Sequence, residues 1–238
     1  MASSRLLPGL ATSLVVAAAG LTAGCARGTD GGFGGGRGSG GALSSSSLST
    51  SGGGTCSIAH LVINEIRSRG PGGANDEFIV LYNPTASPVT LDASWKIEAR
   101  KAVGATYTAR WAGTGKTIPA HGYFLLANST GYTQSPMADE ALTSGVTDTS
   151  SVRLAHAGAP VDAVCYYATA AMATVYDGTF TCEGTPVSNA PHSDGGGAGS
   201  DVDASIKRRP CIDTDDNAAD FVAQMPATPD NAASPPGP

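Results

Sequence analysis

Apolar residues occur in short runs along the chain, and many runs alternate with polar positions. Clusters of glycine, proline, asparagine and aspartate separate the runs at intervals of about 8–15 residues, a spacing typical of all-β sandwiches and barrels. No long helical period is present, and only Met137–Leu142 suggests one short helix. The expected strands are His60–Ile66, Glu77–Asn83, Val89–Leu91, Trp95–Ala99, Ala105–Trp111, Tyr123–Ala127, Val152–Ala155 and Val161–Tyr166.

The first 24 residues have the pattern of a bacterial lipoprotein signal peptide. Arg5 gives a short positive start, an apolar stretch follows, and small residues precede Cys25. Cleavage of such a signal makes Cys25 the lipid-carrying N-terminus, although Thr22 stands where the motif usually has leucine. Ala26, in place of an aspartate, favours the outer membrane or the cell surface. The alternative is ordinary signal-peptidase cleavage nearby, which gives a soluble secreted protein.

A glycine- and serine-rich stretch follows the signal. Residues 26–54 contain 12 glycines and 7 serines among 29 positions, too little apolar surface to fold. Such a stretch predicts a disordered, flexible tether that spans roughly 30 Å on average. We therefore expect a signal peptide at 1–24, lipidated Cys25 with its tether at 25–55, a folded domain at 56–231 and a disordered tail at 232–238.

Charge narrows the classes of partner. Without the signal the chain has 13 basic and 20 acidic residues, a net charge of −7, and it has no basic stripe. Nucleic acid is therefore not an expected partner, because binding to phosphate backbones requires clustered positive charge. We expect a monomer without a cofactor, attached to the membrane through the lipid on Cys25. Its unknown partner would be an envelope or extracellular protein or a glycan.

The remaining four cysteines form an even set in an exported chain. No closely spaced pair suits a zinc site, so the set predicts two disulfides. Cys165 and Cys182 flank a short stretch and are paired locally, which leaves Cys56 and Cys211 to join the ends of the domain. Other pairings remain possible from the sequence alone.

Several motifs in order resemble the bacterial lamin tail domain family. "LVINEIRSRG" and "DEFIVLYNPTASPVTLDASWKIE" resemble its opening strands, and "AHGYFLLA", "PVDAVCYY" and "ASIKRRP" resemble later ones. "DTDDNAADFVAQMPATPDN" resembles its closing segment. The resemblance covers residues 58–231 and implies an immunoglobulin-like β-sandwich that serves as a binding or anchoring module. The chain departs from the family pattern at Cys165 (usually glycine), at Val80 (usually glutamate) and at Ala93-Ser94 (usually Ser-Gly).

Residues typical of catalysis are sparse. His60, His121, His156 and His192 lie at expected strand ends or loops and outside known catalytic motifs, where solvated or capping roles are usual. "WAGTGKT" lacks the first glycine of a phosphate-binding loop and is read as a turn. Glu65 and Glu77, in neighbouring strands, are better read as sheet residues than as an acid/base pair. The charge run at 207–209 is read as protection of an exposed strand edge.

The segment "PCIDTDDNAADF" at 210–221 concentrates carboxylates. Asp213, Asp215 and Asn217 have the spacing of a calcium loop, but the glycine and glutamate that an EF-hand needs are replaced by Ala218 and Gln224. A short turn capped by Thr214 or Asp215, with the next apolar residue entering the core, is the favoured interpretation. Calcium binding remains the alternative.

Two functions follow from these observations. The favoured one is a non-catalytic lipoprotein of the cell envelope that displays a lamin-tail-like binding or structural module. The alternative is a secreted or envelope hydrolase with a dispersed, possibly metal-assisted site. Convergence of histidines and acids in the folded domain would favour the hydrolase.

Overall fold

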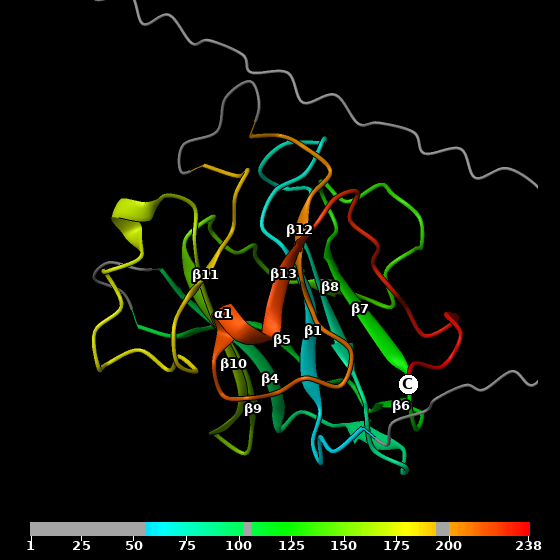
Figure 1. The fold of residues 1–238 in the computed structure, drawn as a ribbon. Coiled ribbons are helices and arrows are strands. Elements are labelled where there is room, and N and C mark those ends of the chain that lie inside the picture. Colours follow the sequence, from blue (N-terminus) through cyan, green and yellow to red (C-terminus); the bar gives the residue numbers. More distant parts are fainter. Residues whose placement is uncertain (1–55, 102–105, 194–199) are drawn as a thin grey trace, which may run out of the picture. The chain divides into compact units, whose positions relative to one another are not determined.

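The computed structural model describes residues 56–101, 106–193 and 200–238, and these residues form a two-layer β-sandwich (Figure 1). The first layer is a six-stranded sheet. Its order is β13 (Phe221–Gln224), β12 (Ser205–Arg208), β1 (Val62–Arg67), β2 (Phe78–Tyr82), β7 (Tyr123–Asn128) and β8 (Glu140–Leu142).

The second layer is a five-stranded sheet, and a two-stranded ribbon accompanies the two layers. The order of the sheet is β11 (Val187–Ser188), β10 (Ala159–Tyr167), β9 (Ser150–His156), β4 (Trp95–Lys101) and β5 (Thr108–Ala112). The ribbon pairs β3 (Val89–Leu91) with β6 (Lys116–Ile118). The helical elements are η1 (Ala170–Met172) and α1 (Asn217–Asp220). In the part of the chain described, no helix is both long and apolar enough to span a membrane.

The alternation of side chains explains why the layers pack. In β2 all five residues are buried, because Ile79 and Leu81 enter the core between the sheets while Phe78 and Val80 join a second apolar cluster. The expected all-β, immunoglobulin-like sandwich is confirmed. Each of the eight strands expected from the sequence overlaps an observed strand.

Two local expectations were wrong. Met137–Leu142 does not form a helix: residues 140–142 pair with β7 as a parallel strand. Residues 232–238 are hydrogen-bonded to the sandwich; for example, the main-chain nitrogen of Ala232 donates to Asp139 and that of Gly237 to the carbonyl of His121. These hydrogen bonds hold the tail in place. They are made by main-chain atoms, so the lack of large apolar side chains in the tail does not prevent them.

Candidate functional site

The aspartate-rich segment after β12 forms a turn and a short helix. Helix α1 spans Asn217–Asp220, and the Asp216 carboxylate accepts hydrogen bonds from two main-chain nitrogens of its first turn. The predicted turn is confirmed, and Phe221 after it is buried in the core. The prediction that Thr214 or Asp215 caps the helix was wrong, because Asp216 has the extended backbone of an N-cap.

Two of the three candidate calcium ligands bind different protein partners, and the third is exposed. Asp213 contacts Arg208 at 3.0 Å and the Nε2 atom of His60 at 3.2 Å. The Asn217 amide bonds to the main chain of β10: it accepts from the nitrogen of Cys165 and donates through Nδ2 to a carbonyl, both at 2.8 Å. Asp215 is exposed. The sequence spacing therefore does not become one ligand set.

Instead, acids from several segments surround Arg208, whose side chain is 2% exposed. Its guanidinium lies 2.7 Å from Asp162, 3.0 Å from Asp213 and 3.5 Å from Asp220. One oxygen each of Asp162, Glu183 and Asp213 lies within 4.8 Å of the others. We call these five residues the Arg208 cluster. The expectation that residues 207–209 protect a strand edge was wrong for Arg208, because β12 lies between β13 and β1.

Burial sets the protonation of the cluster. Desolvation raises the pKa of Glu183 to about 8, and the neighbouring charge of Asp162 acts in the same direction. Burial also raises the pKa of Asp162, although Arg208 opposes this shift. The hydrogen bond with His60 lowers the pKa of Asp213 and raises that of the histidine. Glu183 therefore holds a proton at neutral pH, which reduces repulsion among the carboxylates.

The chemistry of this arrangement is that of an internal ion cluster. His60 pairs with Asp213, and Asp213 pairs with Arg208, so the series of contacts ends on a cation and not on a nucleophile. Hydrolysis needs a nucleophile or an activated water beside the base. The guanidinium lies among the carboxylates, where it supplies the positive charge that they need.

Glu65 and Glu77 do not form an acid/base pair, because each binds its own partners. Glu65 accepts a hydrogen bond from Ser205 Oγ at 2.6 Å and pairs with Lys207 at 3.0 Å. Glu77 accepts from the main-chain nitrogen of Val146 and from the side chain of Asn128, both at 2.8 Å. Burial raises the pKa of Glu77 to about 7. The Glu65 carboxylate thus binds β1 to β12, and the Glu77 carboxylate binds the start of β2 to β7 and to the segment at Val146.

A scan against family models matches residues 55–168 to the Lamin Tail Domain. Residues 55–168 are therefore a lamin tail domain. No curated protein matches the chain. The matched range ends at Ala168, directly after β10. Strands β12 and β13 follow this range, yet β12 pairs with β1 and completes the same sheet.

Two departures from the family pattern have structural reasons in this lamin tail domain. Val80, where the pattern has glutamate, lies in the apolar cluster on the outer face of the six-stranded sheet. Cys165, where the pattern has glycine, forms the predicted disulfide with Cys182. Tyr132, Ala138 and Ala227 pack against the cluster that contains Val80, and the disulfide attaches the segment around Cys182 at Cys165.

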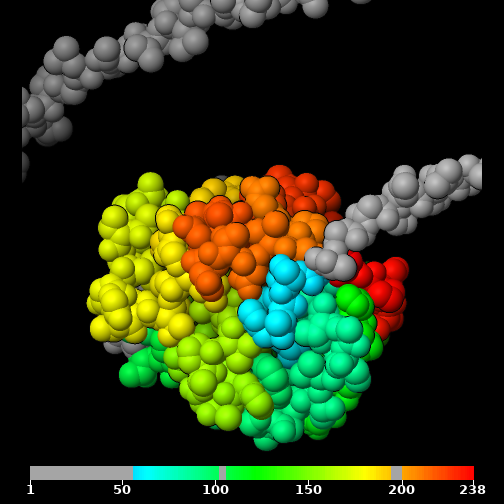
Figure 2. Space-filling model, turned by 60° about the horizontal axis from the view of Figure 1, so that its bottom comes forward, coloured from blue at the N-terminus to red at the C-terminus, as the bar shows by residue number. Residues whose placement is uncertain are grey.

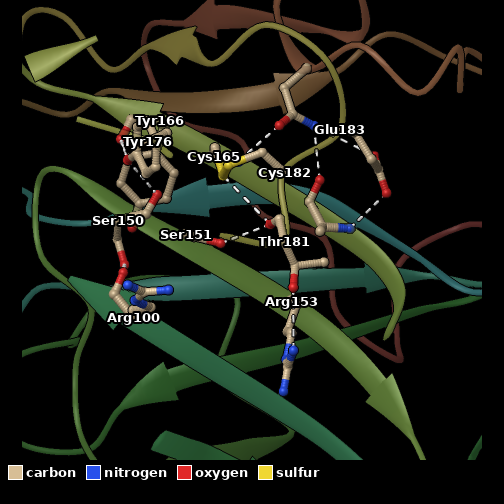
Figure 3. Close-up of a disulfide and its surroundings, with 12 residues drawn as sticks. Arg100, Ser150, Ser151, Arg153, Cys165, Tyr166, Tyr176, Thr181, Cys182 and Glu183 are labelled. Atoms are coloured by element: carbon tan, nitrogen blue, oxygen red, sulfur yellow. Dashed lines mark hydrogen bonds between the residues drawn. A yellow bond between two sulfur atoms is a disulfide. The ribbon is translucent and has the colours of Figure 1, made fainter. Parts of the chain in front are cut away.

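The disulfide fixes a loop, residues 168–186, against the five-stranded sheet of the lamin tail domain (Figure 3). Within this loop, Tyr176 donates to the carbonyl of Ser150 at 2.9 Å, and Thr181 accepts from Ser151 Oγ at 2.9 Å. The guanidinium of Arg100 lies 3.7 Å from the ring centre of Phe180. The loop therefore has anchors beyond the covalent bond.

Cys56 and Cys211 are both free thiols in this structure, so the predicted bond between them is not formed. Cys56 packs near Ile58 and Tyr82, and Sγ of Cys211 lies 4.0 Å from the carbonyl oxygen of Pro238. Burial, followed by the neighbouring side chain of Cys56, raises the pKa of Cys211 to about 11. The pairing remains a prediction.

The histidines have separate roles. His192 is buried, and its ring nitrogens lie 2.8 and 3.0 Å from the carbonyls of Ser200 and Ala204, so of the expected solvated or capping role it fits the capping one. His156 stacks on Trp95 with ring centres 4.3 Å apart.

A groove of about 570 Å³ lies beside β7 and β8 and includes Tyr132 and Met137, of which Met137 is 82% exposed. The longer polar side chains along it have protein partners. Glu140 binds the indole of Trp111, and Gln134 binds Arg67. The groove therefore offers mainly an apolar surface.

Sequence reasoning missed Asp162, Glu183 and Arg208 as one cluster. A signal was present, because Asp162 interrupts the apolar strand "PVDAVCYY" at a core-facing position. A buried carboxylate needs a cation. Arg208 lies two residues after the buried Ile206 and therefore on the same face of β12.

Proposed function

We propose that this chain is a non-catalytic cell-envelope lipoprotein that displays a lamin-tail module for binding or structural support. The observation that carries the proposal is the family match of residues 55–168 directly after a tether and a lipoprotein-type cysteine. Cys25 and the tether lie outside the described residues, so the proposed attachment to the membrane rests on their sequence alone. The membrane partner is the bilayer that holds the Cys25 lipid.

The contacts of the polar residues support a binding role over catalysis. Asp162 and Asp213 of the Arg208 cluster both form ion pairs with Arg208. Glu65 and Glu77 are hydrogen-bonded to neighbouring segments of the chain. Such groups stabilise a fold, because each satisfies a buried neighbour. A rigid sandwich of this kind can present its loops and outer faces to a protein or glycan of the envelope.

One observation favours the hydrolase alternative: His60 converges with the acids Asp213, Asp162 and Glu183, as that alternative requires. A direct assay separates the two functions. Purified protein is incubated with chromogenic phosphodiester, ester and glycoside substrates, with and without zinc or calcium. We expect no turnover above that of Asp213→Asn; turnover that this variant abolishes would support the hydrolase.

Attachment to the membrane through Cys25 is tested in a bacterial host with the full chain and its Cys25→Ser variant. We expect the native chain to enter the detergent phase of a phase-separating extraction and to incorporate a labelled fatty acid, while the variant does neither. A native chain that stays wholly in the aqueous phase would show that the lipid is absent. Protease added to intact cells then reports whether the module faces outward.

A further inference from the structure

The outer face of the six-stranded sheet carries an apolar cluster of its own. Phe78, Val80, Leu125 and Ala127 are each at most 1% exposed, although they point away from the main core. Part of their cover comes from residues 226–238, which we call the proline-rich segment because five of its thirteen residues are proline. Figures 1 and 2 show its later part in red, beside the green of β7.

Hydrogen bonds to main-chain atoms fix the course of the proline-rich segment. The nitrogen of Thr228 donates to Glu65 at 3.0 Å, that of Ala232 to Asp139 at 3.0 Å, and that of Gly237 to the carbonyl of His121 at 2.8 Å. None of its residues is buried. A segment held in this way can leave the surface without unfolding the core.

The end of this segment lies in a specific aromatic site. Tyr82 and Tyr123 are stacked with ring centres 4.8 Å apart, and Gly237 lies directly against them. A Cβ atom at Gly237 would lie 2.4 Å from the Tyr123 hydroxyl and 2.8 Å from Cε2 of Tyr82. The main-chain oxygen of Pro238 accepts a hydrogen bond from Tyr82 and lies 3.3 Å from Nδ1 of His121.

Tyr82 and Tyr123 contact the chain at Gly237, and Tyr82 and His121 lie against the main-chain oxygen of Pro238. Sites that recognise proline-rich peptides likewise combine aromatic rings with hydrogen bonds to the main chain of the peptide. A cavity of about 100 Å³, lined in part by Tyr82, Tyr123 and Pro238, lies beside this site. The contact with Gly237 adds selectivity, because a side chain at that position would meet the rings.

We propose that Tyr82, His121 and Tyr123 form a binding site for an extended Pro-Pro-Gly-Pro-type segment of a partner protein, and that residues 235–238 occupy it as a competitor within the chain. The inference deepens the proposed function, on which it rests, by naming the class of partner that the module takes. Release of the chain's own segment would expose the site. The affinity measured for a partner is then reduced by the fraction of molecules whose site is open.

The test uses full-length chains and a fluorescent, amidated peptide with the sequence of residues 231–238. Gly237→Val introduces a side chain against the two tyrosines and should release the end of the segment. Gly178→Val is the matched control, because a Cβ there meets nothing within 4 Å. Hydrogen exchange at residues 231–238 and thermal melting verify release and an intact fold.

We expect the peptide to bind Gly237→Val at least tenfold more tightly than it binds wild type or Gly178→Val. Adding Tyr82→Phe, which removes one hydroxyl, should weaken that binding, and a peptide with valine for glycine should not bind. Equal binding to all three chains, or a segment that stays protected in Gly237→Val, would overturn the proposal. Self-association of wild type that Gly237→Val abolishes would overturn it in favour of segment exchange between copies. Because the binding assay needs no lipid or envelope, its failure is distinguishable from failure of the proposed mounting.

Discussion

Arg208 and Asp162 join the two sheets across the core, with their charged groups 2.7 Å apart and both side chains at most 2% exposed. Arg208 belongs to β12 of the six-stranded sheet, and Asp162 belongs to β10 of the five-stranded sheet. Both also bind Ile63 at the bulge of β1, where Nε of the arginine donates to the carbonyl and the aspartate accepts from the nitrogen. The pair thus satisfies main-chain groups of Ile63, which lies outside the paired register of β1 with β12.

Replacing Arg208 should therefore be severely destabilising. Arg208→Leu leaves the Asp162 carboxylate buried without its cation, which typically costs about 3–5 kcal/mol of unfolding free energy. Urea unfolding of the purified variant measures this loss. Arg209→Leu is the matched control: Arg209 is exposed and donates to the carbonyl of Ala219, so we expect a loss below about 1 kcal/mol. Equal losses would contradict the role of Arg208.

Stability should fall as the pH rises from mildly acidic to mildly alkaline. Burial raises the pKa of Glu183 to about 8 and that of Glu77 to about 7, from an ordinary 4.5. The unfolded chain releases these protons above about pH 4.5, whereas the folded chain retains them until pH 7 to 8. Stability from this source is thus complete below pH 4.5 and is lost as the pH rises through 8.

Urea unfolding at pH 5 and pH 8.5 measures this effect. Glu183→Gln keeps a neutral side chain at every pH and should reduce the difference by on the order of 1 kcal/mol, a modest value because the side chain is partly exposed. Glu98→Gln, in an ion pair with Arg153, serves as the control. An unchanged difference in Glu183→Gln would refute the protonated state of Glu183.

Calcium should leave the stability of the domain unchanged. Asp213 is bound to Arg208 and His60, and the amide of Asn217 is bound to β10, so a calcium ion would have to displace protein partners. Thermal melting of the disulfide-intact protein in millimolar calcium or in chelator should give the same midpoint. A rise of several degrees that disappears in Asp213→Ala and Asp215→Ala would restore the calcium hypothesis.

Oxidation should join Cys56 to Cys211. The side chain of Cys56 is among the causes that raise the pKa of Cys211, so the two thiols are neighbours in the folded domain. Peptide mapping without reduction, on protein prepared in an oxidising compartment, should find this bond beside Cys165–Cys182. Closing so long a loop is worth about 5 kcal/mol in the chain-entropy model, less any strain. A Cys56–Cys165 or Cys56–Cys182 peptide would refute the assignment, and Cys211→Ser provides the control.

The strands that sequence patterns located best are those with several buried residues. Strand β2 is an example, because its unbroken apolar run is buried on both faces. Strands β6, β8 and β11, which were not expected as strands, have two or three residues each and one buried residue apiece; β3 is as short, yet it was expected. Their pairing depends on neighbours that are distant in sequence.

The candidate site was less predictable than the fold. The run at 207–209 looks like a solvated charge patch, and only the position of β12 between two strands shows that Arg208 is buried. The proline-rich segment has the composition of a loose tail, and its contacts use main-chain atoms and a glycine that packs on aromatic rings. Composition cannot reveal contacts of that kind.

The most direct test of the central claim, a lipid-anchored display of the lamin-tail module, is mass spectrometry of the mature protein isolated from bacterial membranes. The account predicts a chain that begins at Cys25 and carries a diacylglyceryl group on its sulfur, with Cys25→Ser lacking this modification. A mature chain that begins at another residue, or that begins at Cys25 without lipid, would contradict it.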